Sequence, residues 1–196
     1  MRANLGPDAI LERRDDLAAR GVVLGVGGEH QQHVERHGIP DQNIDDVPAV
    51  KKVLRDMRFD VVVDFICYTP LQALIDIELF YNMTKQFIFV SSSACYQRLG
   101  CKYPITETAT LCNPQWEYAQ NKIDCEKVFL EHYRKENFPI TVVRPGHTYD
   151  TIIPDAVGNG DWTVAQRMID GKPVVLHGDG TTLWTVTHSE DFARAF

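Results

Sequence analysis

The fold of this chain is decided by Phe59-Asp60-Val61-Val62-Val63-Asp64-Phe65-Ile66, a nearly continuous run of apolar and β-branched residues. Such residues favour strands, and a strand without polar alternation is typical of a parallel sheet covered on both faces. The apolar pattern from Pro70 to Asn82 predicts a helix directly after this strand. Residues 86–90 predict the next strand. This strand–helix–strand order is typical of a parallel sheet with crossover helices.

The remaining sequence continues the alternation of strands and helices. The expected elements are a helix over 8–20, a strand at Val22–Val26, a short polar helix within 29–38, helices over 46–57 and 117–135, a strand over 138–145, a helix over 162–169, strands at 174–176 and 183–187, and a helix from Glu190. The 117–135 helix is expected to turn Ile123, Val128, Phe129 and Tyr133 toward the core. We therefore predict an α/β fold, a doubly wound parallel sheet that is Rossmann-like and incomplete at both ends.

Composition excludes several classes of function. The net charge of −7 and the pI near 5.4 argue against a general phosphate-backbone binder. No apolar run reaches the roughly 20 residues of a membrane span, and the start lacks the apolar core of a signal peptide, so a cytoplasmic protein is expected. Five cysteines without a CxxC motif favour reduced packing residues. The spacing of His30, His33 and His37 favours a solvated helix face over zinc, and no metal is expected.

Two segments carry groups suited to acid–base chemistry. Tyr118 and Lys122 are four residues apart, which on a helix places them on one face, a turn from each other. An ammonium beside a phenol lowers the pKa of the phenol, giving a base that works near neutral pH. The serines at 91–93 follow the strand at 86–90, at the sheet edge where α/β proteins bind ligands. A turn that caps backbone groups is the alternative role for these serines.

These motifs together resemble the extended short-chain dehydrogenases/reductases of the NAD-dependent epimerase/dehydratase family. The resemblance runs from about residue 43 to the end. It rests on Phe59–Asp64, Ser91–Tyr96, Tyr118–Lys122, Val143–Pro145, and Gly178–Gly180 with His188–Asp191. It implies bound NAD, with NADP left open, a Ser/Thr–Tyr–Lys triad, and a small-molecule substrate that in many members is a nucleotide sugar. A homodimer is also an expectation from the resemblance.

The resemblance assigns roles to individual catalytic residues. Tyr118 would exchange the proton of a substrate hydroxyl, and Lys122 would hold the nicotinamide ribose and lower the pKa of Tyr118. Ser92, four residues before Tyr96, is the expected triad serine, and Ser93 is the second choice and an expected substrate contact together with Tyr118.

The resemblance also assigns cofactor contacts. They are Phe65, Ile66 and Cys67 at the strand exit, Asn43 and Ile44 near the adenine, Lys122, and Pro145, Gly146 and His147 on the nicotinamide side. For each of these, an ordinary strand end, loop or tight turn is the competing interpretation.

Two departures from the family pattern narrow the expected chemistry. Ser93 and Ala94 stand where the family's sugar 4,6-dehydratases have an Asp-Glu pair, which favours epimerisation or simple oxidation and reduction over dehydration. The chain also has no GxGxxG or GxxGxxG turn for a pyrophosphate. Val22 lies 39 residues before Val61, whereas the family's first strand lies roughly 60 residues before it. Residues 22–26 are therefore expected to form the second strand, although a shift into the central position is the alternative.

Residues 1–150 are thus expected to form an NAD(P)-binding Rossmann-like domain whose first strand is missing or atypical. Residues 151–196 are expected to begin the substrate-binding region, and the chain is interpreted as an internal piece of a longer enzyme. The function predicted is an NAD-dependent epimerase or oxidoreductase acting on a nucleotide sugar. The alternatives are an inactive fragment and an RNA-binding module, although the acidic pI makes a nucleic-acid partner unfavourable.

Overall fold

The computed structural model describes residues 22–28, 31–37, 47–151, 162–181 and 183–195. The chain divides into two compact units, residues 1–144 and 145–196. The predicted helix over 8–20 and the predicted adenine contacts Asn43 and Ile44 lie outside the described residues.

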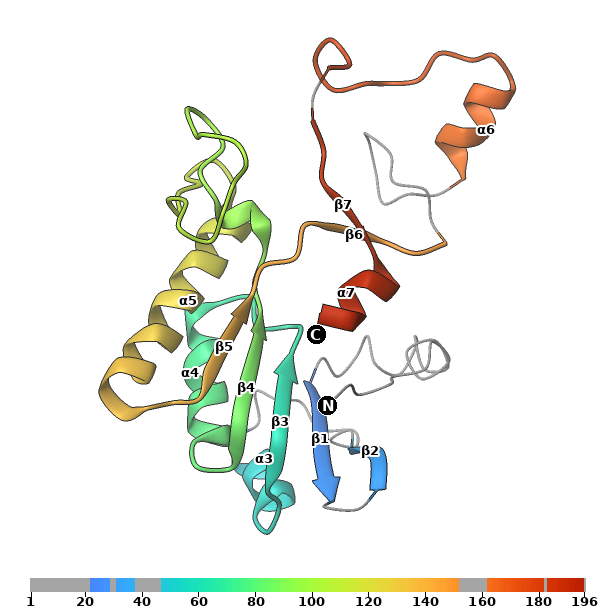
Figure 1. Ribbon diagram of the computed structural model, residues 1–196. Helices are drawn as coiled ribbons and strands as arrows, with labels where there is room; N and C mark the ends of the chain where they lie inside the picture. Colours follow the sequence, from blue (N-terminus) through green and yellow to red (C-terminus); the bar gives the residue numbers. More distant parts are fainter. Residues whose placement is uncertain (1–21, 29–30, 38–46, 152–161, 182, 196) are drawn as a thin grey trace. The chain divides into compact units, whose positions relative to one another are not determined.

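The first unit contains a five-stranded sheet with the order β2-β1-β3-β4-β5 (Figure 1). Its strands are β1 Val22–Gly28, β2 Gln31–His37, β3 Phe59–Asp64, β4 Thr84–Val90 and β5 Ile140–Val143. Strands β3, β4 and β5 run parallel, as the crossover pattern predicted. The predicted α/β fold with a parallel Rossmann-like sheet is therefore confirmed.

The position of β1 corrects the prediction for residues 22–26. β1 pairs directly with β3, and it runs antiparallel, with Val22 opposite Asp64 and Gly25 opposite Val61. The prediction that residues 22–26 form the second strand of a parallel sheet is wrong. They occupy the central position beside β3, which was the alternative prediction, although they run antiparallel. Unpaired backbone groups on a buried strand are costly, and an antiparallel partner satisfies them as well as a parallel one does.

The segment predicted as a short polar helix is also a strand. β2 pairs antiparallel with β1, with Leu24 opposite His37. The prediction relied on the polar composition of the segment, but a short helix without an apolar stripe gains little from packing. Only two residues separate β1 from β2, a length that favours a hairpin.

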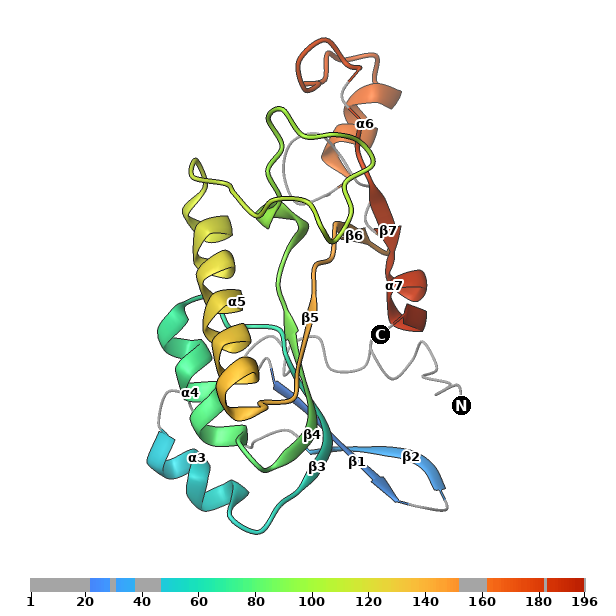
Figure 2. The same ribbon diagram turned by 60° about the vertical axis from the view of Figure 1, so that its left-hand side comes forward.

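The helices of the first unit pack on one another beside the sheet (Figures 1 and 2). They are α3 Val47–Leu54, α4 Pro70–Phe80 and α5 Glu117–Glu136. A capping box between Thr69 and Gln72 begins α4, with Pro70 at its first turn. Asn137, in the left-handed conformation at φ 57°, ends α5. Tyr133 lies near this C-terminal end of α5, and 53% of its surface is exposed. The prediction that it faces the core is therefore wrong.

Phe87 of β4 lies at the centre of the core. Its ring centroid lies 5.7 Å from that of Phe80, 5.6 Å from that of Phe129 and 5.4 Å from that of Phe138. All four side chains are fully buried. Tilted aromatic contacts of this kind stabilise a core beyond the area they bury. This cluster fixes α4 and α5 against the middle of the sheet and so holds the ends of β3 and β4 in place.

The second unit is a small pair of parallel strands with two helices. β6 His147–Tyr149 pairs with β7 Val186–His188, and the helices are α6 Thr163–Ile169 and α7 Ser189–Ala195. The predicted strand at 174–176 is wrong, because Val175 and Leu176 are exposed and unpaired in a connecting segment. The strand predicted at 183–187 begins only at Val186. None of the helices that the structure describes has the length and apolar character needed to cross a membrane.

Candidate active site

The carboxyl ends of the parallel strands meet at one edge of the sheet. The ladder places Asp64 beside Phe89 and Val90 beside Val143, so β3, β4 and β5 end at the same level. The residues that follow, Phe65–Cys67, Ser91–Ser93 and Arg144, therefore gather at this edge. Open α/β sheets bind their ligands at such an edge.

The side chain of Lys122, on α5, extends to the carboxyl ends of β3 and β4. Its side chain is buried, and its Nζ donates to the carbonyl oxygens of Cys67 at 2.7 Å and Val90 at 2.8 Å. The same nitrogen lies 4.7 Å from the ring centroids of Tyr68 and Phe89. Burial lowers the pKa of Lys122 from its ordinary value. The lysine therefore joins α5 to the ends of two strands and places a cation beneath the edge.

Tyr118 lies one turn before Lys122 and is half-buried. Its ring lies 5.1 Å from that of Trp116 and 6.3 Å from that of Tyr68, and the Nζ of Lys122 lies 5.9 Å from its centroid. Burial raises the pKa of Tyr118, while a hydrogen bond with Ser92 acts in the opposite direction. The pKa of Tyr118 is thus raised and not lowered as the sequence predicted, because desolvation of the phenol is the largest influence on it. Tyr118 is a phenol at neutral pH.

Ser92 combines the two roles that the sequence left open. It precedes a short 3-10 helix, η1 Ser93–Cys95, and its Oγ accepts from the backbone N–H of Ala94 at 3.1 Å. The same hydroxyl interacts with Tyr118. Ser93 contributes its carbonyl oxygen, which accepts from the N–H of Tyr96 at 3.2 Å. The structure thus brings Ser92, Tyr118 and Lys122 together, with Ser93 in the adjacent turn.

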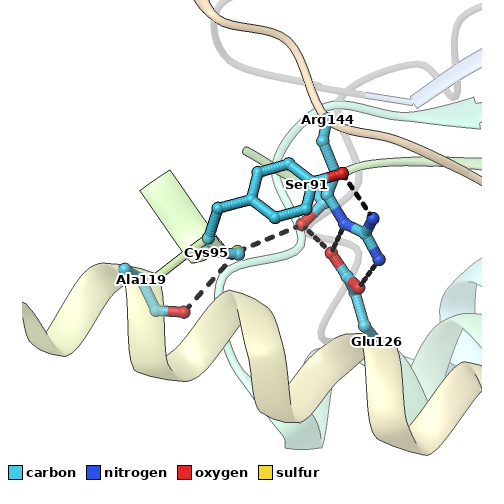
Figure 3. A network of polar contacts seen from close by, with 6 residues as sticks. Ser91, Cys95, Ala119, Glu126 and Arg144 are labelled. Atoms are coloured by element: carbon cyan, nitrogen blue, oxygen red, sulfur yellow. Dashed lines mark hydrogen bonds and ion pairs between the residues drawn. The ribbon is translucent and has the colours of Figure 1, made fainter. Parts of the chain in front are cut away.

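A buried polar network that the sequence analysis missed supports this arrangement (Figure 3). Glu126 of α5, 1% exposed, accepts from Ser91 Oγ at 2.5 Å and forms a two-point ion pair with Arg144 at 2.9 and 2.6 Å. Arg144 also donates to the hydroxyl of Tyr96 at 2.8 Å. The only signal in the sequence was spacing: Glu126 follows Lys122 by four residues on the same helix face.

The network ties η1 to α5. The thiol of Cys95 donates to the carbonyl oxygen of Ala119 at 3.7 Å and lies 3.6 Å from Ser91 Oγ, as Figure 3 shows. Burial raises the pKa of the Cys95 thiol, which therefore stays protonated as a donor. Because Ser91 and Cys95 flank Ser92, these contacts fix the backbone that positions Ser92 against Tyr118.

The turn after β3 is organised by Asp64. Its Oδ1 accepts from the N–H groups of Ile66 at 2.6 Å and Cys67 at 3.1 Å. Phe65 is exposed at this turn, Ile66 is half-buried, and Cys67 is buried. Phe65 and Ile66 thus offer apolar surface at the ligand-binding edge. Cys67 is buried, and its carbonyl oxygen accepts from Lys122. Its predicted contact with the cofactor stays a prediction.

The residues at this edge of the sheet suit the nicotinamide half of a dinucleotide, but they do not provide a glycine-rich turn for its pyrophosphate. A nicotinamide riboside suits the edge beside Tyr118, where apolar side chains, a hydroxyl pair and a buried cation meet. The glycines of β1 do not lie there, because β1 runs antiparallel and its Gly28 end is at the opposite edge of the sheet from Asp64. Pro145, Gly146 and His147 belong to the second unit. There, a Cβ atom added to Gly146 would lie 3.6 Å from the carbonyl oxygen of Thr185. Their predicted role at the nicotinamide stays a prediction.

Comparison with known proteins agrees with the fold. A model of the NAD dependent epimerase/dehydratase family matches residues 69–196. UDP-glucose 4-epimerase with UDP-glucose from Thermotoga maritima has a TM-score of 0.64 at 21% identity, over 86% of this chain and 60% of that one. dTDP-glucose 4,6-dehydratase with NAD from Bacillus anthracis has a TM-score of 0.63 at 21% identity, over 79% and 51%.

A third solved structure gives the same result. UDP-glucuronic acid 4-epimerase from Bacillus cereus, with UDP-glucuronic acid and NAD, has a TM-score of 0.56 at 18% identity, over 77% of this chain and 51% of that one. The chain thus spans between half and three-fifths of the length of these structures. No curated protein matches the sequence.

Proposed function

Because the chain belongs to the NAD dependent epimerase/dehydratase family, we propose that it supplies the catalytic edge of an enzyme that oxidises or epimerises a nucleotide sugar with NAD. The observation that supports this most directly is the position of Lys122. An ammonium held by the carbonyls of Cys67 and Val90, one helical turn from Tyr118, is costly to bury even though it anchors two strand ends. Such perturbed groups at a ligand-binding edge favour a functional site.

In this proposal Tyr118 exchanges the proton of a substrate hydroxyl. NAD, when bound, supplies the acceptor for the hydride that leaves the same carbon. Ser92, whose hydroxyl interacts with Tyr118, orients the phenol oxygen, and the charge of Lys122 stabilises the phenolate form that takes the proton of the substrate hydroxyl. Phe65 and Ile66 offer the apolar surface for the nicotinamide, and Lys122 a donor for its ribose. Burial of Tyr118 keeps it protonated until these partners are in place.

The substrate class follows from the related structures and from two residues of this chain. Structures similar in fold contain UDP-glucose and UDP-glucuronic acid, so a nucleotide sugar is the substrate we propose. Ser93 and Ala94 both lie in η1, and neither can exchange a proton in the way that eliminating water from a keto sugar requires. We therefore propose epimerisation, or oxidation and reduction without dehydration.

Titration calorimetry with NAD tests the first step of this proposal. Binding at micromolar concentrations is expected, and absence of binding up to millimolar NAD would favour the inactive-fragment alternative.

Appearance of reduced-nicotinamide absorbance with UDP-glucose or UDP-glucuronic acid tests the second step. Tyr118→Phe should abolish that signal, whereas Tyr133→Phe, an exposed tyrosine on the same helix, should preserve it. Activity that survives Tyr118→Phe would overturn the assignment. A salt-dependent shift of RNA would favour the binding-module alternative instead.

A further inference from the structure

Three potential metal ligands meet in the interior behind the β3 exit. One carboxylate oxygen each of Asp64 and Asp76 and the Sγ of Cys67 all lie within 4.8 Å of one another. The residues are 2%, 2% and 1% exposed. They come from the end of β3, the turn that follows it, and the middle of α4. The cluster lies outside the acid–base groups described above, although the carbonyl of Cys67 holds Lys122.

One oxygen atom of this cluster lacks a hydrogen-bond partner. Asp76 Oδ2 is buried and has no hydrogen-bond partner. Burying a carboxylate oxygen without a partner is costly, and here a carboxylate oxygen of Asp64 lies within 4.8 Å of one of Asp76. Two carboxylates in contact inside a protein require either a shared proton or a cation between them.

The surroundings offer the features of a built metal site. Asp64 is oriented by the N–H groups of Ile66 and Cys67, which donate to its Oδ1 in the way that outer contacts orient metal ligands. The Sγ of Cys125, from α5, lies outside this group of three, but at 4.0 Å from the Sγ of Cys67 it is within reach as a fourth donor. Cys125 is also buried. The cluster itself has one thiol and two carboxylates, from β3, α4 and one turn, and α5 brings a second thiol beside it.

We propose that Asp64, Cys67, Asp76 and Cys125 bind one divalent cation of the zinc class. A mixture of thiolate and carboxylate donors suits Zn²⁺ and disfavours Mg²⁺ and Ca²⁺, which take oxygen ligands. Bond lengths of about 2.0–2.3 Å place tetrahedral donor atoms within roughly 4 Å of one another, so donors that already lie within 4.8 Å need to move little on binding. All donors are buried, so the site is structural, linking the β3 exit to both α4 and α5.

Cobalt is the probe that tests this proposal, because thiolate coordination gives Co²⁺ a charge-transfer absorption that oxygen coordination does not. The purified chain, stripped with a chelator, is titrated with Co²⁺ and then with Zn²⁺. We expect one equivalent of Co²⁺ with the thiolate band, displaced by one equivalent of Zn²⁺. The double variant Cys101→Ala/Cys112→Ala should behave in the same way, because these cysteines lie outside the cluster.

Variants of the ligands locate the site. Cys67→Ser should remove most of the thiolate band, and Asp76→Asn, which keeps the side-chain shape, should weaken Co²⁺ binding more than tenfold. A melting temperature that rises with Zn²⁺ in the parent chain and not in Asp76→Asn would support the site independently. If one of the two variants fails to fold, the other still decides, because each removes a different ligand of the same site. Absence of the band in the Cys101→Ala/Cys112→Ala chain, or a band that Cys67→Ser leaves unchanged, would overturn the proposal and favour a proton shared by Asp64 and Asp76.

Discussion

The carbonyl oxygen of Cys67 accepts a hydrogen bond from the Nζ of Lys122 at 2.7 Å, across 55 positions in the sequence. This contact joins the turn after β3 to α5. Since the same Nζ also donates to Val90 at the end of β4, one side chain fixes the spacing of two strand ends and one helix. The groups we propose for catalysis therefore depend on a backbone carbonyl that no side-chain motif reveals.

Replacing Lys122 by Met is expected to destabilise the fold as well as to abolish NAD binding. The change leaves the carbonyls of Cys67 and Val90 without their donor, at about 1–3 kcal/mol for each buried group that stays unpaired. Urea unfolding measures this loss. Lys127→Met, at an exposed lysine of the same helix, should change stability by less than about 1 kcal/mol. Equal effects of the two changes would contradict the anchoring role of Lys122.

The phenol of Tyr118 is expected to ionise above pH 10, its ordinary pKa, because burial disfavours the phenolate. The folded chain then holds this proton longer than the unfolded chain does. The stability that Tyr118 contributes is therefore present below pH 10 and is lost as the pH rises through the raised pKa. The difference in phenolate absorbance between the parent chain and Tyr118→Phe measures the titration. A phenol that titrates near neutral pH without NAD would contradict this prediction.

Ser92→Ala is expected to raise the pKa of Tyr118 further, because the hydrogen bond from Ser92 favours the phenolate. Ser93→Ala is the matched control, since the structure assigns Ser93 a backbone contact with Tyr96. The same absorbance titration compares the two variants. The triad serine would have to be reassigned if Ser93→Ala moved the pKa and Ser92→Ala did not.

Glu126→Ala is expected to cost about 3–5 kcal/mol, because it leaves Arg144 without its buried partner. The change also removes the acceptor of Ser91 Oγ. Thermal and urea unfolding measure the loss, and reduced NAD binding would show that the network positions the edge. Glu78→Ala, which breaks an exposed ion pair with Lys51, should cost less than about 1 kcal/mol. A small effect of Glu126→Ala would mean that Arg144 finds water or another partner.

The local patterns of the sequence predicted most elements correctly. The apolar run at 59–64, the capped helix from Pro70 and the long helix from Glu117 appear almost as expected. Periodicity, caps and β-branched runs act within a few residues, so they are readable without the fold. The predictions at 22–26 and 29–38 failed in direction or type, because strand pairing depends on which partner the folded chain offers.

The residues of the candidate site were likewise predicted from the sequence only in part. The spacing of Tyr118 and Lys122 and the serines after β4 identified the residues that meet at the edge. Glu126, Ser91 and Arg144 were not recognised as one network, because their contacts join β4, α5 and the end of β5 across 18 and 35 positions. The raised pKa of Tyr118 was also unpredictable, since burial and the placement of the Lys122 ammonium depend on packing.

By itself, the sequence determined the α/β class, the parallel core strands and the family, because these rest on local patterns and short motifs. Only the tertiary structure decided that β1 lies antiparallel beside β3, that Lys122 is bound by two carbonyls, and that Asp64, Cys67 and Asp76 share one buried volume. Each of these depends on long-range packing in a low-dielectric interior. There, the energy of a polar group is set by its partners and not by its neighbours in sequence.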